Sequence, residues 1–244
     1  MSGVANGRRL VWSDEFDGPV GFPPDRAVWG FELGGGGFGN RELQRYTDSL
    51  ANAARDGRGN LAVTARASGA EYTSARLVSK GKVEVCYGLI ETRVRVPRGA
   101  GLWPGVWALG GNIDTVPWPG CGEIDLVEHV GVEPRRAFGT IHCPGHAGVA
   151  GFRGAVDFSR DLAEDFHCFA VDWTPERIEW SLDGRVYHAA TPDDVPGGWV
   201  FDHPFYLLIN LAVGGDLEGP ISAETEFPSQ LLVDYVRVYA PCRE

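Results

Sequence analysis

Hydrophobic and polar residues alternate with a period of two along much of the chain, which is typical of β-strands. Segments 90–96 and 177–182 alternate in this way, and segment 205–213 is a run of mostly apolar residues. The pattern contains no amphipathic segment long enough for a helix of three turns. The predicted strands are 61–65, 82–87, 90–96, 166–173, 177–182, 185–188, 205–213 and 231–239.

Turn signals indicate how these strands are connected. Asp183-Gly184 separates two predicted strands, and this dipeptide favours a type I′ hairpin. Other turn residues recur at intervals that suit an antiparallel sandwich or jelly roll. We therefore predict an all-β fold, a two-sheet antiparallel β-jelly roll sandwich. Because the last predicted strand ends five residues before the C-terminus, we expect an N-terminal extension at 1–9 and a single domain at 10–240.

The composition fits such a domain and adds a hint of function. The chain has 244 residues, which one large all-β domain accommodates. It contains 34 Gly, 8 Trp and a single Met. The glycines indicate many tight turns, and the tryptophans indicate aromatic surfaces that bind a flat ligand.

The charge balance narrows the range of partners. There are 22 Lys and Arg against 33 Asp and Glu, which gives a net charge of −11. Nucleic-acid binding needs a basic surface, so we expect no nucleic-acid partner. No apolar run approaches the roughly 18 residues of a membrane span, and no basic amphipathic helix is visible, so we expect no membrane partner. We expect a monomer.

The most informative segment is 122–129, Gly-Glu-Ile-Asp-Leu-Val-Glu-His. In a strand, Glu123 and Asp125 point to one face. Strict alternation would then bury Glu128, and a buried, unpaired carboxylate is costly. A one-residue β-bulge near 126–127 returns Glu128 to the face of the other two. The sequence therefore predicts three carboxylates on one face of a bulged strand.

Three carboxylates so close together cannot all ionise easily, so the arrangement is destabilising unless it has a use. Glycoside hydrolysis is such a use, because one carboxylate attacks the sugar while another donates a proton. Asp125 lies between the two glutamates, where a hydrogen bond to Glu123 would hold its geometry and share charge. The alternative is a solvated strand face, which is the commoner setting for a Glu-x-Asp pattern taken alone.

Aromatic residues around this segment favour the catalytic interpretation. Trp103, Trp107 and Trp118 precede the acidic strand. An indole ring stacks on the apolar face of a pyranose, and its N–H gives a directional contact. Packing in the core is the alternative role for each of these tryptophans.

Cysteine and histidine leave two further interpretations open. If the strand of Glu123 pairs with 137–142, Cys121 and Cys143 lie near each other and either form a disulfide or remain two thiols. A zinc site is the other interpretation, although its candidate residues fit no standard spacing. Those candidates are Cys121, His129, His142, Cys143 and His146.

Taken together, these segments resemble glycoside hydrolase family 16, in particular its laminarinase-like endo-β-1,3-glucanases. The acidic strand has the family's bulged Glu-x-Asp-x-x-Glu form, whereas members that act on xyloglucan have the shorter Glu-x-Asp-x-Glu. The matching stretches are 10–18, 34–47, 72–82, 88–110, 118–131, 139–145, 166–184, 204–215 and 233–239.

The resemblance implies a concanavalin A-like sandwich with a concave substrate cleft and a role for each matching residue. Glu123 aligns with the catalytic nucleophile, Glu128 with the general acid/base, and Asp125 with the carboxylate that assists the nucleophile. His142 aligns with a histidine on the leaving-group side of the cleft. The remaining positions that align with sugar-contacting residues are Asn40, Arg76, Trp103, Trp107, Trp118 and Asn210.

The resemblance also implies that catalysis needs no cofactor and that a structural Ca²⁺ lies on the convex side. The matching positions are Glu15, Gly59 and Asp234, and oxygen-only ligation suits this ion. We expect a secreted protein. Residues 1–16 lack the apolar region of a secretory signal, so either the protein is made without one or the signal has been removed from this chain.

Three departures from the family pattern concern the cleft. Ala108 and the Leu126-Val127 pair stand where Met is common, and Asp216-Leu217 replaces Asn-Trp. These departures affect the expected strength of the sugar-binding subsites and the expected preference for substrate length. They leave the expected hydrolytic chemistry unchanged.

The expected activity is retaining, endo-acting hydrolysis of β-1,3-glucan. A same-fold hydrolase of mixed-linkage β-1,3-1,4-glucan or of a galactan, and a non-catalytic β-glucan recognition protein, are the alternatives. The sequence retains all three carboxylates, which disfavours the non-catalytic alternative.

Overall fold

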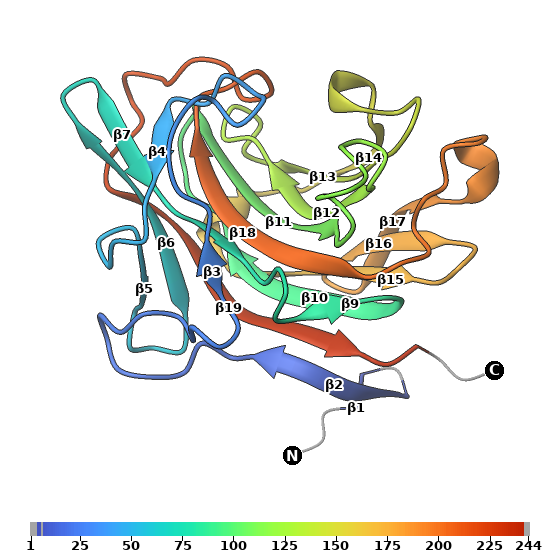
Figure 1. Ribbon diagram of the computed structural model, residues 1–244. Coiled ribbons are helices and arrows are strands. Elements are labelled where there is room, and N and C mark those ends of the chain that lie inside the picture. Colours follow the sequence, from blue (N-terminus) through green and yellow to red (C-terminus); the bar gives the residue numbers. More distant parts are fainter. Residues whose placement is uncertain (1–3, 6, 242–244) are drawn as a thin grey trace.

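The computed structural model describes residues 4–5 and 7–241, and these form two β-sheets packed face to face (Figure 1). The only helices among them are three 3-10 turns of three residues each, η1 (Gly148–Ala150), η2 (Leu162–Glu164) and η3 (Pro192–Asp194). None of the described helices is long and apolar enough to cross a membrane. The predicted all-β, two-sheet sandwich is confirmed.

The larger sheet contains eleven of the described strands, all paired antiparallel except β4 with β7. These are β1 (Val4–Ala5), β2 (Arg8–Asp14), β4 (Gln44–Tyr46), β5 (Ala53–Arg55), β6 (Leu61–Ser68), β7 (Glu71–Ser74), β10 (Gly88–Arg95), β15 (His167–Trp173), β16 (Ile178–Leu182), β17 (Arg185–Ala190) and β19 (Ser229–Tyr239). The order is β17-β16-β15-β10-β19-β6-β7-β4. Strand β2 pairs with β19, so segments from opposite ends of the chain lie side by side (Figure 1). The predicted boundary between 1–9 and 10–240 stays a prediction.

The smaller sheet contains eight of the described strands and carries the acidic segment. These are β3 (Gly30–Phe31), β8 (Arg76–Val78), β9 (Glu84–Val85), β11 (Leu102–Gly110), β12 (Glu123–His129), β13 (Arg136–His142), β14 (Phe152–Asp157) and β18 (Phe205–Val213). Its order is β14-β13-β12-β11-β18-β8-β3. Strand β18 is buried along its whole length, as its apolar run predicts.

Two local predictions have different outcomes. The Asp183-Gly184 hairpin is confirmed, because both residues have positive φ angles, 50° and 77°, between the paired strands β16 and β17. The predicted strand at 82–87 is too long, since β9 spans only Glu84–Val85. The positive φ of Tyr87, 66°, turns the chain out of the extended conformation directly after it.

Apolar side chains from the facing sides of both sheets form the core. Ile124 and Leu126 of β12 belong to it, and so do the fully buried Trp173 and Trp180 of the larger sheet. The Trp180 indole N–H crosses the core and donates a 2.7 Å hydrogen bond to the backbone oxygen of Asp125. One face of the smaller sheet therefore rests on the core, and the opposite face is free to form a site.

This buried hydrogen bond generates a stability prediction. Trp180→Phe keeps an aromatic ring but leaves the Asp125 carbonyl without its donor, so we expect a loss of about 1–3 kcal/mol in the free energy of unfolding. Trp199→Phe is the matched control, because the Trp199 indole donates to Pro175 at an exposed position where water can replace it. Urea unfolding measures both, and equal losses would contradict the prediction.

Candidate active site

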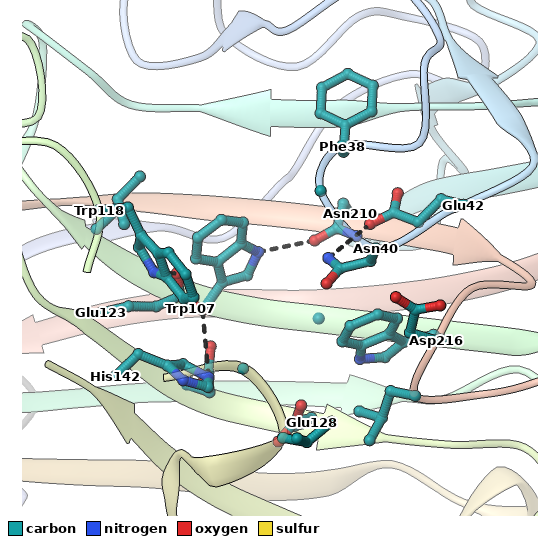
Figure 2. Close-up of a pocket in the computed structure, with 18 of the residues that line it drawn as sticks. Phe38, Asn40, Glu42, Trp107, Trp118, Glu123, Glu128, His142, Asn210 and Asp216 are labelled. Atoms are coloured by element: carbon teal, nitrogen blue, oxygen red, sulfur yellow. Dashed lines mark hydrogen bonds and ion pairs between the residues drawn. The ribbon is translucent and has the colours of Figure 1, made fainter. Parts of the chain in front are cut away.

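The outer face of the smaller sheet forms the floor of a cleft of about 600 Å³. All three predicted catalytic residues and all seven predicted substrate-binding residues line it. These ten are Asn40, Arg76, Trp103, Trp107, Trp118, Glu123, Asp125, Glu128, His142 and Asn210. Most of them are drawn in Figure 2, which shows Trp118 and His142 on either side of Glu123, with Glu128 farther along the cleft.

The predicted bulge in the acidic strand is present. On the β11 side the register passes from Trp107 opposite Asp125 to Val106 opposite Val127, so residue 126 has no partner. On the β13 side it also shifts between Asp125 and Glu128. The bulge buries Leu126 and Val127 in succession and returns Glu128 to the cleft.

Glu123 is held from two sides. The Trp118 indole N–H donates to Glu123 Oε2 at 2.9 Å, and His142 Nε2 lies 3.7 Å from Oε1. Burial, and then the negative charge of Asp125, raise the pKa of Glu123 well above its usual range. The positive charge of His142 and the hydrogen bond from Trp118 oppose this shift by stabilising the carboxylate.

Asp125 and His142 form the centre of the acidic row. His142 Nε2 lies 3.4 Å from Asp125 Oδ2, and both residues are more than nine-tenths buried. Burial alone would lower the pKa of His142, but the nearby carboxylates, Asp125 first, outweigh it and raise that pKa to about 9. A protonated His142 therefore lies between two acidic side chains at neutral pH.

Glu128 has its own set of partners on the neighbouring strands. Thr140 donates its hydroxyl to Glu128 Oε2 at 2.7 Å, and Arg153 Nη2 lies 3.1 Å from each carboxylate oxygen. Burial and Asp125 raise the pKa of Glu128, while Arg153 lowers it. The two glutamates thus have different surroundings on one strand.

A hydrogen-bonded wall continues the cleft beyond the acidic strand. Trp107 Nε1 donates to Asn210 Oδ1 at 2.8 Å, and Asn210 Nδ2 donates to the Tyr46 hydroxyl at 3.1 Å. The Arg76 guanidinium lies over the rings of Trp107 and Phe38, with its carbon 4.7 and 5.1 Å from their centroids. These contacts fix flat aromatic and planar polar groups at the positions where a sugar would bind.

The structure also brings residues to the cleft that sequence reasoning missed. Glu42 lies there almost fully buried and accepts hydrogen bonds from Gln44 at 2.6 Å and Tyr46 at 3.1 Å. The sequence could have indicated Glu42, because it lies within stretch 34–47, which matches the family pattern. Arg153 and Val149 also line the cleft, and no motif marks either of them.

Of the three departures from the family pattern, one does not concern the cleft. Ala108 is fully buried in the core, so its side chain faces away from any substrate, and the expectation for this residue is corrected. Leu126 and Val127 are both buried in the core as well, although Val127 also borders the cleft. Asp216 and Leu217 do line the cleft.

Strand register brings the three predicted calcium positions to one region of the larger sheet. Strands β2 and β6 both pair with β19, with Asp14 opposite Val236 and Leu61 opposite Val233, so Glu15 and Gly59 approach Asp234. Arginines hold the two carboxylates. Arg237 donates to both oxygens of Glu15 at 3.0 and 2.7 Å, and Arg93 donates to Asp234 Oδ2 at 2.6 Å.

The described residues form neither the disulfide nor the zinc site that the sequence left open. Cys121 packs with Leu109, Tyr206 and Leu208, whereas Cys143 belongs to the main core, and both are free thiols. Within the described part of the chain, the one group of three or more potential metal-ligating side chains is Glu123, Asp125 and His142, whose ligand atoms lie within 4.8 Å of one another. The disulfide and the five-residue zinc site considered from the sequence are therefore both wrong for this structure.

The fold and this geometry define a class of protein. An open cleft on a β-sandwich, with two separately supported glutamates on its floor and three tryptophans along it, is the site of a polysaccharide-cleaving hydrolase.

Comparison with known proteins identifies the family. The model of glycosyl hydrolases family 16 matches residues 43–236. A β-glucanase from Rhodothermus marinus is 43% identical over 243 residues, covering 94% of this chain and 84% of that protein. A glucan endo-1,3-β-glucosidase from Cryptopygus antarcticus is 40% identical over 228 residues, covering 86% of this chain and 82% of that protein. The solved endo-β-1,3-glucanase from Pyrococcus furiosus has a TM-score of 0.90 and 42% identity, covering 98% of this chain and 97% of that one. The chain therefore belongs to glycosyl hydrolases family 16.

The charge of His142 generates a pH prediction. Its pKa is about 9 in the folded protein against an ordinary value of 6.5, so its contribution to stability is complete below the lower value and is lost as the pH rises through the higher one. We expect the unfolding free energy of the protein to exceed that of His142→Gln by about 1–3 kcal/mol at acidic pH, and by less as the pH approaches 9.

Urea unfolding at a series of pH values measures this difference. His188→Gln is the comparison variant, because burial lowers the pKa of His188 and its pH dependence has the opposite sign. A His142→Gln difference that stays constant with pH would contradict the prediction.

Proposed function

We propose that this protein is a retaining, endo-acting hydrolase of internal β-1,3-glucosidic bonds in laminarin-like β-glucan. The observation that carries the proposal is the bulge in β12, which places Glu123 and Glu128 on one face at the floor of an open cleft. An open cleft admits a polymer whose scissile bond is internal. Relatives named for β-glucan and β-1,3-glucan support the choice of substrate.

In the first step Glu123 attacks the anomeric carbon as an ionised nucleophile. The Trp118 N–H and the cationic His142 favour its carboxylate against the opposing effects of burial and Asp125. Protonated Glu128 gives its proton to the departing glycosidic oxygen. Burial and Asp125 raise the pKa values of both glutamates, so the carboxyls titrate as a coupled set, and the reactive state is the one in which Glu123 is ionised and Glu128 is protonated.

In the second step a water molecule replaces the leaving sugar. Glu128, now a carboxylate, removes a proton from this water, which attacks the glycosyl-enzyme and releases Glu123. Asp125 stays between the two glutamates and, through His142, keeps a positive charge close to Glu123. Trp103, Trp107 and Trp118 stack on sugar rings along the cleft.

The catalytic assignment predicts that Glu123→Gln and Glu128→Gln each lower kcat on laminarin by about 10²–10⁴-fold while the fold is retained. Both substitutions keep the side-chain shape and remove the nucleophile or the acid. Glu133→Gln is the control, because this glutamate pairs with Arg136 away from the cleft. Reducing-end release and circular dichroism measure activity and fold. Turnover near that of the unmodified protein in either cleft variant would contradict the assignment.

The linkage preference is a separate prediction. We expect kcat/KM for laminarin to exceed that for lichenan, a mixed-linkage glucan, by about tenfold or more, because one mismatched subsite costs about 1–3 kcal/mol. Agarose is the negative control. Equal rates on laminarin and lichenan would favour the mixed-linkage alternative, and binding of laminarin without release of reducing ends would favour the recognition protein.

We also propose a structural Ca²⁺ held by Glu15, Gly59 and Asp234. Both carboxylate oxygens of Glu15 accept from Arg237, so Glu15 would offer its backbone carbonyl oxygen, as Gly59 would. The ion pair of Asp234 with Arg93 uses Oδ2, so Oδ1 remains available to complete an oxygen-only set. Because the ion would bind only the folded chain, we expect Ca²⁺ to raise Tm relative to chelator, and Asp234→Asn to remove the difference. An identical response of the variant and the unmodified protein would contradict this site.

The polymeric nature of the substrate supports a secreted protein, since a long glucan does not cross a membrane. The complete cleft within one chain supports a monomer.

A further inference from the structure

Arg153 contacts the carboxylate that the proposed function assigns to proton transfer, although nothing in the family pattern singles it out. It lies on β14, the edge strand of the smaller sheet, opposite Thr140 of β13. Its Nη2 is 3.1 Å from both oxygens of Glu128, and its Nε donates to Thr140 Oγ1 at 3.2 Å. The Thr140 hydroxyl in turn donates to Glu128 Oε2 at 2.7 Å. Glu128 is therefore fixed by donors from two neighbouring strands.

The arginine itself is held in place. Its guanidinium carbon lies 5.0 Å from the centroid of the Phe138 ring, and its side chain is one-quarter exposed at the cleft. A guanidinium fixed on an aromatic face keeps its orientation and loses little conformational entropy when it pairs with a carboxylate.

The other titratable groups that face Glu128 come from three strands. Asp125 precedes it on β12, His142 lies on β13, and the Tyr187 side chain of β17 carries a buried hydroxyl that has no hydrogen-bond partner. Asp125 opposes ionisation of Glu128, whereas His142 and Arg153 favour it. Of these groups Arg153 is the one that keeps its charge at every pH at which the fold is stable.

We propose that Arg153 is a positioning residue that sets the acidity of Glu128 and stabilises the carboxylate left after proton transfer to the leaving group. This inference rests on the proposed function. In the glycosylation step an oxygen of Glu123 forms a bond to the anomeric carbon, and the bond from that carbon to the glycosidic oxygen breaks. The electron pair of the broken bond stays on the glycosidic oxygen, which takes the proton of Glu128. The negative charge that appears on Glu128 lies directly against the guanidinium.

Two kinetic consequences follow. With Arg153 present, Glu128 is a stronger acid, so proton donation to a poor leaving group such as a sugar hydroxyl is faster. The same interaction lowers the pH above which Glu128 has lost its proton. Removing the positive charge should therefore slow cleavage of the natural bond and extend the active range to higher pH.

The test compares Arg153→Met with Arg153→Lys in kcat/KM across pH. On laminarin we expect Arg153→Met to lower the plateau about tenfold and to move the basic limb up by about one pH unit or more. On a dinitrophenyl β-laminaribioside, whose leaving group needs no proton, we expect a plateau close to that of the unmodified enzyme. Arg153→Lys restores the position of the basic limb because it keeps the charge. Arg177→Met is the control, since this arginine pairs with Glu179 at an exposed position outside the cleft.

A second measurement does not depend on hydrolysis. Carbon-13 NMR of the glutamate carboxyls follows the titration of Glu128, with Glu128→Gln identifying its signal. We expect the pKa of Glu128 to rise in Arg153→Met and to change little in Arg153→Lys. If Arg153→Met loses thermal stability, the same titration can be followed in Arg153→Gln, a second variant without the positive charge.

Three results would overturn the inference. They are an unshifted basic limb in both neutral variants, an equal loss of activity on laminarin and on the aryl substrate, or an unchanged Glu128 titration. An unmodified protein that does not hydrolyse laminarin would instead contradict the proposed function, and the NMR titration would still report whether Arg153 sets the acidity of Glu128.

Discussion

The site depends on one constraint, that three carboxylates of a single strand must reach the same face. A regular strand cannot meet it, because five positions separate Glu123 from Glu128 and alternation places them on opposite sides. The bulge at Leu126 resolves the conflict, and both neighbouring strands shift register around it. Two consecutive apolar residues then enter the core while both glutamates line the cleft. The same irregularity therefore satisfies the core and creates the chemistry.

Crowding of negative charge is the cost of this arrangement, and the structure offsets it with donors placed unequally. Glu123 has the neutral Trp118 N–H and a histidine shared with Asp125. Glu128 has a hydroxyl and a permanently charged guanidinium. In a partly buried site such interactions are stronger than in water, so small differences in partners separate the behaviour of two otherwise identical side chains. The two glutamates of one strand therefore differ in the partners that stabilise their carboxylates.

Much of this could be predicted from the sequence, because the signals are local. Alternation predicts strands, Asp183-Gly184 predicts its hairpin, and the spacing of Glu123, Asp125 and Glu128 predicts the bulge. The partners could not be predicted in the same way. Arg153 is 25 positions from Glu128 in the sequence, and it reaches Glu128 only because of the register in which β14 pairs with β13. This register is set by the whole sheet and not by local sequence. Ala108 is the opposite case, a residue wrongly expected at the cleft. The resemblance suggested a cleft position, but the pleat of the strand directs its side chain into the core.

The strand backbone next to the bulge also receives a hydrogen bond from the core. The Trp180 N–H reaches the carbonyl of Asp125 from the opposite sheet. It can approach only because residue 139 is glycine, where an added Cβ would lie 2.4 Å from the indole ring. Trp180 in turn stacks on His188, with centroids 4.9 Å apart. The position of the acidic strand is thus tied to packing between the two sheets, so changes deep in the core should reach the carboxylates through this hydrogen bond as well as through the apolar residues of β12.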